Sequence, residues 1–436
     1  MKSRHKMRFT ETFISCVFWQ QSLLFDSPIA SLRMDNWLSR RRFLGVSATT
    51  CVTGSTASVA RHTPDDEGSK QASPQLQSDG SNLRSQVSNT APVDVRGAIY
   101  VPTRAFNRYQ MWREYDPEVI ERDLGYAARL NLNSIRTWLS YEYWFEDRDA
   151  HGEKLKHFLQ TAETHGIRVL LGLFDSIGEE PTLDNLVGSD LHSGVQTFSP
   201  STRTMRNPDL WDNPRDFIQW FMTRYSDDNR LLAIELSNEP GWRPERRRFV
   251  KAMSELLTHY RGSIPLTIGS TSLANTTDYL EWGMDILQFH YNFAQSPSDF
   301  RRTLRQAKFI QTKSGTPVWL SEWQRIRSGD SFFTDLNGEA RFPNYSSLAP
   351  LIHATNIGNF FWSLMVRPAS ELHFRQQGMV NGLFHEDGAV WSLNDARAIT
   401  AMSGNSSFEG TERREYPNWM TGLQSSTNSQ SDLYPR

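Results

Sequence analysis

The sequence Leu231-Leu-Ala-Ile-Glu-Leu-Ser-Asn-Glu-Pro240 joins an apolar run to a polar turn. The apolar part has the length and composition of a buried strand, and Asn238-Glu-Pro240 is typical of the loop that follows one. A second stretch, Pro317-Val-Trp-Leu-Ser-Glu-Trp323, has the same form and places Glu322 where the first places Glu239. Barrel folds gather the C-terminal ends of their parallel strands on one face. The two stretches therefore predict a parallel sheet with two carboxyl groups at one edge.

Short apolar or β-branched runs alternate with helical patterns along residues 95–403. The expected strands are Arg96–Val101, Ser134–Trp138, Ile167–Phe174, Leu231–Leu236, Leu266–Gly269, Ile286–His290, Pro317–Ser321 and Asn359–Leu364. The expected helices are Pro117–Leu130, Lys154–His165, Pro214–Tyr225, Pro244–Tyr260, Thr277–Trp282, Pro297–Lys313, Ser347–Thr355 and Asn394–Met402. Asp116 and Asn213 each precede a proline and are expected N-caps. Eight such units indicate an α/β fold, either a doubly wound sheet or, as we predict, a single-domain (β/α)8 barrel.

The connections that follow strands are longer than those that precede them. Four are long and either polar or aromatic, and they span 102–115, 175–213, 324–346 and 366–390. In a barrel all such loops lie on the face that carries the active site. This asymmetry favours an enzyme with an extended binding groove.

The composition excludes several classes of function. The chain has 436 residues and a formal net charge of −2, so it lacks the excess of basic residues that indicates a nucleic-acid partner. Both cysteines, Cys16 and Cys51, lie near the N-terminus, so the body has no cysteine for a disulfide, a metal or a nucleophile. Residues 61–94 and the tail 404–436 are polar, and we interpret the first as a disordered linker.

Residues 1–60 are interpreted as a leader, with Met34 as an alternative start. Ser39-Arg-Arg-Arg-Phe-Leu44 resembles a twin-arginine signal, and an apolar stretch, Gly45–Ala60, follows it and ends in small residues. The stretch Phe13–Phe25 is too short and too polar to span a membrane. We therefore expect an exported protein, periplasmic or extracellular, without stable membrane insertion.

Two carboxyl groups, one that donates a proton and one that attacks, are what hydrolysis of a glycosidic bond requires. A retaining enzyme holds them about 5–5.5 Å apart. Asn238 would then be placed to bind the sugar 2-hydroxyl. The alternative is that Asn238-Glu-Pro240 is an ordinary turn and Glu322 a solvated charge. No metal, phosphate-loop or dinucleotide motif is present, and we expect no cofactor.

Five motifs along residues 95–403 make the chain resemble clan A glycoside hydrolases, particularly glycoside hydrolase family 5. They are Asn133-Ser-Ile-Arg136, Ser237-Asn-Glu-Pro240, Phe289-His-Tyr291, Ser321-Glu-Trp323 and Phe361-Trp362. The resemblance implies a (β/α)8 fold, Glu239 as acid/base and Glu322 as nucleophile. It also implies Arg136 as the cation that keeps Glu322 ionised and Trp362 as the platform under the sugar. A structural salt bridge for Arg136 and a core position for Trp362 are the alternatives.

The chain departs from the family pattern on the sixth and third strands. The family often has His-x-Tyr, whereas Tyr291 directly follows His290 here, and Asn292 occupies the next position. Because adjacent strand residues point in opposite directions, we favour His290 and keep Tyr291 as a second candidate. On the third strand Asp175 stands near the position of a family histidine, and it either lines the site or caps a loop.

These features together predict a monomeric retaining glycoside hydrolase that cleaves an oligo- or polysaccharide of β-linked glucan or mannan type. Aromatic residues at or after strand ends, Trp323 among them, are candidates for stacking on sugar rings. The alternatives are a transglycosylase with the same residues, a carbohydrate-binding barrel without turnover, and a barrel enzyme that uses its carboxylates for another reaction.

Overall fold

The computed structural model describes residues 94–294, 296–324, 341–405 and 407–423. All of them belong to one unit of the chain, Ser81–Arg436. The leader and the linker up to residue 93 lie outside the described residues, so the export signal stays a prediction.

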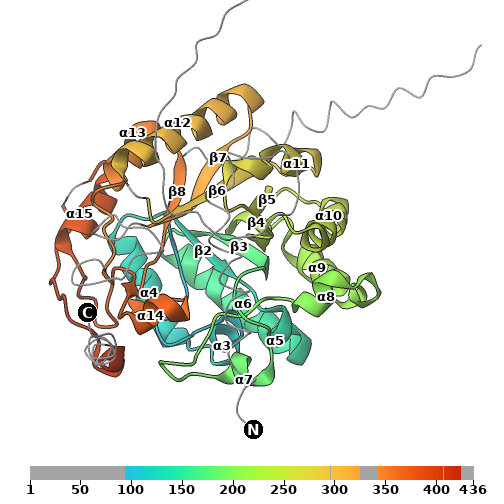
Figure 1. Ribbon diagram of the computed structural model, residues 1–436, viewed down its shortest axis with the longest axis horizontal. Helices are drawn as coiled ribbons and strands as arrows, with labels where there is room; N and C mark the ends of the chain where they lie inside the picture. Colours follow the sequence, from blue (N-terminus) through green and yellow to red (C-terminus); the bar gives the residue numbers. More distant parts are fainter. Residues whose placement is uncertain (1–93, 295, 325–340, 406, 424–436) are drawn as a thin grey trace, which may run out of the picture. The chain divides into compact units, whose positions relative to one another are not determined.

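Eight parallel strands form a closed barrel in chain order, β1 to β8 (Figure 1). Their bounds are β1 Arg96–Ile99, β2 Ser134–Trp138, β3 Arg168–Asp175, β4 Leu231–Asn238, β5 Leu266–Gly269, β6 Ile286–Asn292, β7 Val318–Gln324 and β8 Gly358–Phe361. The hydrogen-bonded pair of β1 and β8 closes the sheet. The (β/α)8 barrel is therefore confirmed over the doubly wound sheet.

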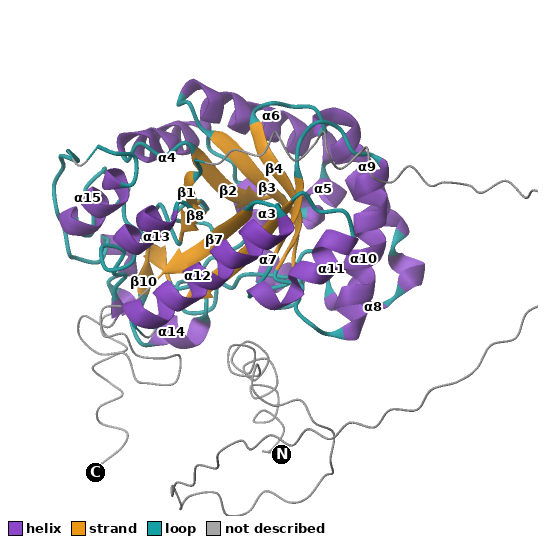
Figure 2. Cartoon of the chain, turned by 90° about the horizontal axis from the view of Figure 1, so that it is seen from above, coloured by secondary structure: helices purple, strands orange, loops and turns teal. Residues whose placement is uncertain are grey.

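Helices surround the strands (Figure 2). Those that connect successive strands are α4 Pro117–Arg129, α6 Arg148–Thr164, α9 Asp212–Tyr225, α10 Pro244–His259, α11 Thr276–Glu281, α12 Pro297–Ser314 and α13 Ala349–Thr355, and α15 Leu393–Ala401 follows β8. Asp116 caps α4 as predicted, because its side chain accepts hydrogen bonds from the N–H groups of Glu118 and Val119. The prediction for Asn213 is wrong: α9 begins at Asp212, two residues before the expected start at Pro214, so Asn213 lies inside it.

The loops on the C-terminal face carry short elements of their own. These are α3 Arg108–Arg113, α5 Tyr141–Glu146, α7 Leu183–Val187, α8 Thr202–Arg206, η2 Pro208–Leu210, η3 Leu273–Asn275, β9 Arg367–Pro368, α14 Leu372–Gln376 and β10 Val380–Asn381. Residues 325–340 of the loop after β7 lie outside the described residues. No helix within the described ranges has the length and apolar character that a membrane crossing requires.

The apolar core is divided by the barrel wall. An inner cluster joins residues of seven strands or strand ends: Val95, Ile99, Trp138, Leu170, Leu232, Ala233, Ile286, Trp319, Phe360 and Trp362. A larger outer cluster packs the opposite strand faces, such as Leu287, Phe289 and Leu320, against the helices. A strand residue therefore points either into the barrel or toward the helices, and this choice decides which polar residues reach the site.

The folded body extends beyond the expected boundary at residue 403. Phe408, Met420 and Leu423 are buried, and η5, Asn418–Met420, forms within this segment. Arg413 pairs with Asp387 of the preceding loop. Residues 407–423 are therefore part of the barrel unit, because the few large apolar side chains in this polar stretch find a place in its core.

Candidate active site

A bulge in β7 turns Glu322 into the barrel. The pairing with β6 matches Leu320 to Phe289 and Glu322 to His290, which leaves Ser321 as an extra residue on β7. Trp319 belongs to the inner cluster, so strict alternation would point Glu322 toward the helices. Bulges next to active sites commonly redirect a side chain in this way.

The backbone at the end of β4 likewise redirects side chains, here those of the adjacent residues Asn238 and Glu239. Adjacent residues of an extended strand cannot face the same side. Here β4 has an extra residue relative to β5 between Glu235 and Asn238, and Glu239 adopts a left-handed backbone with φ 43°. This conformation is unfavourable for a residue other than glycine, and such strain is typical of functional positions. Both side chains thereby reach the barrel mouth.

The two carboxyl groups meet there. One oxygen of Glu239, one of Glu322 and a ring nitrogen of His290 all lie within 4.8 Å of one another. His290 Nδ1 contacts Glu239 Oε1 and lies 3.6 Å from Glu322 Oε2. The predicted pair is therefore brought together, with His290 between its members.

Arg136 is the buried cation of the site. Its Nη1 donates to Glu322 Oε2 at 3.3 Å and to the Ser321 carbonyl at 3.2 Å. Its Nε and Nη2 donate to the two oxygens of Glu235, each at 2.8 Å. Glu235 also accepts hydrogen bonds from Trp138 Nε1 and Gln288 Nε2. Arg136 thus forms the structural salt bridge with Glu235 and also contacts Glu322, and its role in keeping Glu322 ionised stays a prediction.

The amide of Asn238 is oriented by charged neighbours. Its Oδ1 accepts from Arg136 Nη2 at 2.8 Å, and its Nδ2 donates to Asp175 Oδ1 at 3.0 Å. An amide nitrogen has two hydrogens, so one remains for a ligand. Asp175 is held in turn by Arg108 and Gln196. The structure therefore places Asp175 behind the site, where it orients Asn238.

The protonation states follow from burial and hydrogen bonding. Burial raises the pKa of Glu239 to about 7 and also raises the pKa of Glu322. Burial lowers the pKa of His290 to about 4, so its ring is neutral near pH 7. Two carboxyl groups this close share one proton. Glu322 accepts hydrogen bonds from Arg136 and, at 2.6 Å, from Asn292, and both hydrogen bonds favour the ionised form of Glu322.

Trp362 follows β8 and belongs to the inner cluster. Its side chain is 7% exposed. Its backbone N–H donates to the Trp323 carbonyl, and Tyr345 O–H donates to its carbonyl. The residue therefore has the core position that the sequence analysis gave as the alternative, and its role as a platform under the sugar stays a prediction.

Two predicted site residues lie outside the site. The Tyr291 ring stacks on Phe300 of α12, with ring centroids 5.4 Å apart. Trp323 is fully buried in the outer cluster, and its Nε1 donates to Asn359 Oδ1. Both predictions are corrected for one reason, because each residue directly follows a strand residue that points into the barrel.

Sequence reasoning missed Asn292 and Glu235. Asn292 follows His290 with the two-residue period of a strand, and this period was the signal for it. Glu235 is a fully buried carboxylate inside an otherwise apolar run. A charge at such a position requires a partner, and Arg136 is the partner.

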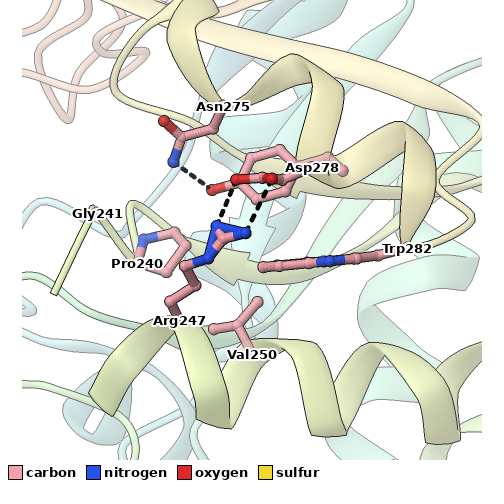
Figure 3. Close-up of a pocket in the computed structure, with 8 residues that line it drawn as sticks. Pro240, Gly241, Arg247, Val250, Asn275, Asp278 and Trp282 are labelled. Carbon is pink, nitrogen blue, oxygen red and sulfur yellow. Dashed lines mark hydrogen bonds and ion pairs between the residues drawn. The ribbon is translucent and has the colours of Figure 1, made fainter. Parts of the chain in front are cut away.

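A hollow beside the Glu239 loop is part of the scaffold (Figure 3). It is lined by Pro240, Gly241, Arg247, Val250, Asn275, Asp278, Tyr279 and Trp282, and it has no room for a water molecule. Arg247 of α10 forms an ion pair with Asp278 of α11, and its guanidinium lies 5.2 Å from the Trp282 ring centre. These contacts brace the turn that follows Glu239.

The group Glu239, His290 and Glu322 could also hold a metal ion by its ligand types. Arg136 already supplies a positive charge to Glu322 from 3.3 Å. A second cation on the same oxygens would be repelled by the fixed guanidinium. The arrangement is therefore better suited to carboxyl chemistry than to a metal centre.

No protein family model matches the chain, and no curated protein sequence matches it. Solved structures do. An exo-beta-1,4-mannosidase from Opitutaceae bacterium strain TAV5 aligns with a TM-score of 0.53 and 15% identity, over 76% of this chain and 60% of its own. A GH5_18 variant from Bifidobacterium longum subsp. longum, in complex with Manb1-4GlcNAc, aligns with a TM-score of 0.53 and 16% identity, over 78% and 88%. A GH5_18 variant from Streptomyces cattleya, in complex with the same sugar, gives 0.53 and 13%, over 73% and 83%.

This chain therefore spans less than two thirds of the first of these proteins and most of the other two. At such identities the likeness concerns the fold. The chain has the (β/α)8 barrel fold that these glycoside hydrolase structures have.

Proposed function

We propose that this protein is a retaining glycoside hydrolase that cleaves β-mannosidic bonds. The observation that carries the proposal is the carboxyl pair, with oxygens within 4.8 Å and one member held against Arg136. Retaining enzymes separate these groups by about 5–5.5 Å, and inverting ones by about 6.5–9.5 Å to leave room for water. The proximity therefore favours double displacement.

The choice of mannose rests on the structures of similar fold, which include an exo-beta-1,4-mannosidase and complexes with Manb1-4GlcNAc. A binding protein without turnover would have no need for a protonated Glu239 facing an ionised Glu322 beside a buried guanidinium. The same trio is what a glycosidase requires.

In the first step Glu322 attacks the anomeric carbon while Glu239 gives its proton to the glycosidic oxygen. The bond to the leaving sugar breaks, and a glycosyl ester forms on Glu322. In the second step Glu239 takes a proton from water, the water oxygen attacks the anomeric carbon, and the ester bond breaks. The free N–H of Asn238 binds the sugar 2-hydroxyl, a contact that strengthens in the transition state.

The product anomer tests this mechanism. With aryl β-mannosides and β-1,4-mannooligosaccharides, NMR during the first turnovers is expected to show the β-anomer, which then mutarotates. Aryl β-glucosides and β-glucans serve as the comparison, and we expect slower cleavage of both. An α-anomer as first product would contradict retention, and cleavage of glucosides alone would overturn the choice of sugar. Products longer than the substrate would identify a transglycosylase.

The pH dependence tests the role of Glu239. Burial raises its pKa to about 7, so the acid form persists up to that pH, and kcat/KM is expected to fall as the pH rises further. In Glu239→Gln this fall of kcat/KM with rising pH, the falling limb, should disappear. The substrate for this measurement is a dinitrophenyl β-mannoside, because its leaving group needs no proton. If the limb persists in Glu239→Gln, the titration of another group causes it, and Glu239 does not set the pH dependence.

A further inference from the structure

Three buried arginines surround the loop that precedes α3, next to the active site. Arg108 begins α3, Arg367 lies in β9, and Arg375 lies in α14. Arg367 Nη2 donates to the Ala105 carbonyl at 2.8 Å, and the Arg375 guanidinium lies 4.9 Å from the Phe106 ring centre. The three cations thus gather from segments far apart in the sequence.

Arg108 connects this group to the carboxyl pair. Its side chain is 4% exposed and, among the described residues, forms an ion pair with Asp175 alone, at 3.1 Å. Asp175 orients Asn238, as described above. The Arg108 guanidinium also lies 4.4 Å from the Trp138 ring centre, and its Nε is buried without a hydrogen-bond acceptor among the described residues.

Arg367 has no carboxylate partner in the described part of the chain. Its residue is 4% exposed, and its Nε is buried without an acceptor. Burial lowers its pKa to about 9, with Arg108 and Arg375 adding to the effect, and it remains charged at neutral pH. A buried cation without a counter-charge is unfavourable, and a group perturbed in this way beside an active site is a candidate for ligand binding.

Arg375 has a different role. Its guanidinium donates to the carbonyls of Leu191, Gly194, Ala369 and Ser370. These four acceptors tie two loops together, so Arg375 is a structural residue.

We propose that Arg108 and Arg367 bind an anionic substituent, a carboxylate or a sulfate ester, on the glycone of the substrate. This inference rests on the proposed glycosidase function. The planar fork of arginine matches both groups, and a neutral mannoside has nothing to satisfy the unpaired charge. Arg108 is connected through Asp175 to Asn238, the residue that we propose binds the sugar 2-hydroxyl, so we assign the substituent to the sugar beside the cleaved bond.

Binding to the inactive Glu322→Ala variant tests the proposal without turnover. Calorimetry would compare a β-mannobioside with its counterparts that carry a uronic acid or a 6-sulfate at the non-reducing end. One charge-assisted pair predicts a Kd about ten- to a hundredfold lower for one anionic sugar than for the neutral one. The anion that binds more tightly identifies the substituent.

Adding Arg367→Ala should remove this preference, and Arg367→Lys should retain part of it. Arg104→Ala is the control, because Arg104 lies in the loop that precedes α3, where its side chain is 60% exposed and paired with Glu386. Thermal unfolding verifies that each variant is folded, and Arg367→Lys replaces the alanine variant if that one is not. Equal binding of neutral and anionic sugars, or a preference that survives loss of Arg367, would contradict the anion site but not the proposed glycosidase function. If no sugar binds, both the anion site and the glycosidase function are contradicted.

Discussion

Glu322→Ala is expected to lower kcat on an aryl β-mannoside by about 10⁴-fold or more, because loss of a nucleophile removes the covalent step altogether. Glu322 accepts hydrogen bonds from Arg136 and Asn292 inside the barrel, and both favour its ionised form. Neither neighbour can attack the anomeric carbon in its place. Steady-state kinetics with a dinitrophenyl β-mannoside measures the loss, and thermal unfolding verifies that the variant is folded.

Chemical rescue distinguishes a lost nucleophile from a disturbed site. Azide is expected to enter the space left by the Glu322 carboxylate and to form an α-mannosyl azide of inverted configuration. Glu322→Gln is the matched control, since its amide fills that space, so it should be equally inactive and not rescued. A Glu322→Ala variant that keeps a tenth of the activity without azide would exclude Glu322 as nucleophile.

The strand positions were predictable where apolar runs have sharp ends. Ser134–Trp138 and Leu266–Gly269 match β2 and β5 residue for residue. The order of eight units then placed Glu239 and Glu322 on one face, and the structure brings them together. Such long-range geometry follows from the barrel repeat alone.

The direction of individual side chains was not predictable in the same way. A one-residue bulge reverses the side of the strand to which every later side chain points. Nothing in the sequence Trp319-Leu-Ser-Glu322 indicates that Ser321 is the extra residue. Trp323 was expected in the site as an aromatic residue at a strand end, and it lies outside because the bulge turns Glu322 inward instead. The pairing of Glu235 with Arg136 was equally hidden, because the two are separated by 99 positions in sequence.

The second large effect is expected for Arg136→Met. Removal of one partner of a buried ion pair destabilises a protein by about 3–5 kcal/mol, because the other charge is left without compensation. Glu235 would be that charge, since it is fully buried and accepts two hydrogen bonds from Arg136. Urea unfolding of Arg136→Met against the wild type measures the free energy of unfolding.

The double variant Arg136→Met/Glu235→Gln separates the two tasks of Arg136. The side-chain amide introduced by Glu235→Gln is neutral and keeps a carbonyl oxygen that accepts a hydrogen bond from Trp138 or Gln288. The free energy of unfolding of the double variant should therefore exceed that of Arg136→Met by at least about 1–2 kcal/mol. Activity should stay absent, because Arg136 opposes the effect of burial on the pKa of Glu322, and without it that carboxyl is protonated and cannot attack. A double variant whose destabilisation equals the sum of the single changes would show that the ion pair does not govern stability. A double variant with wild-type activity would show that Glu322 needs no cation.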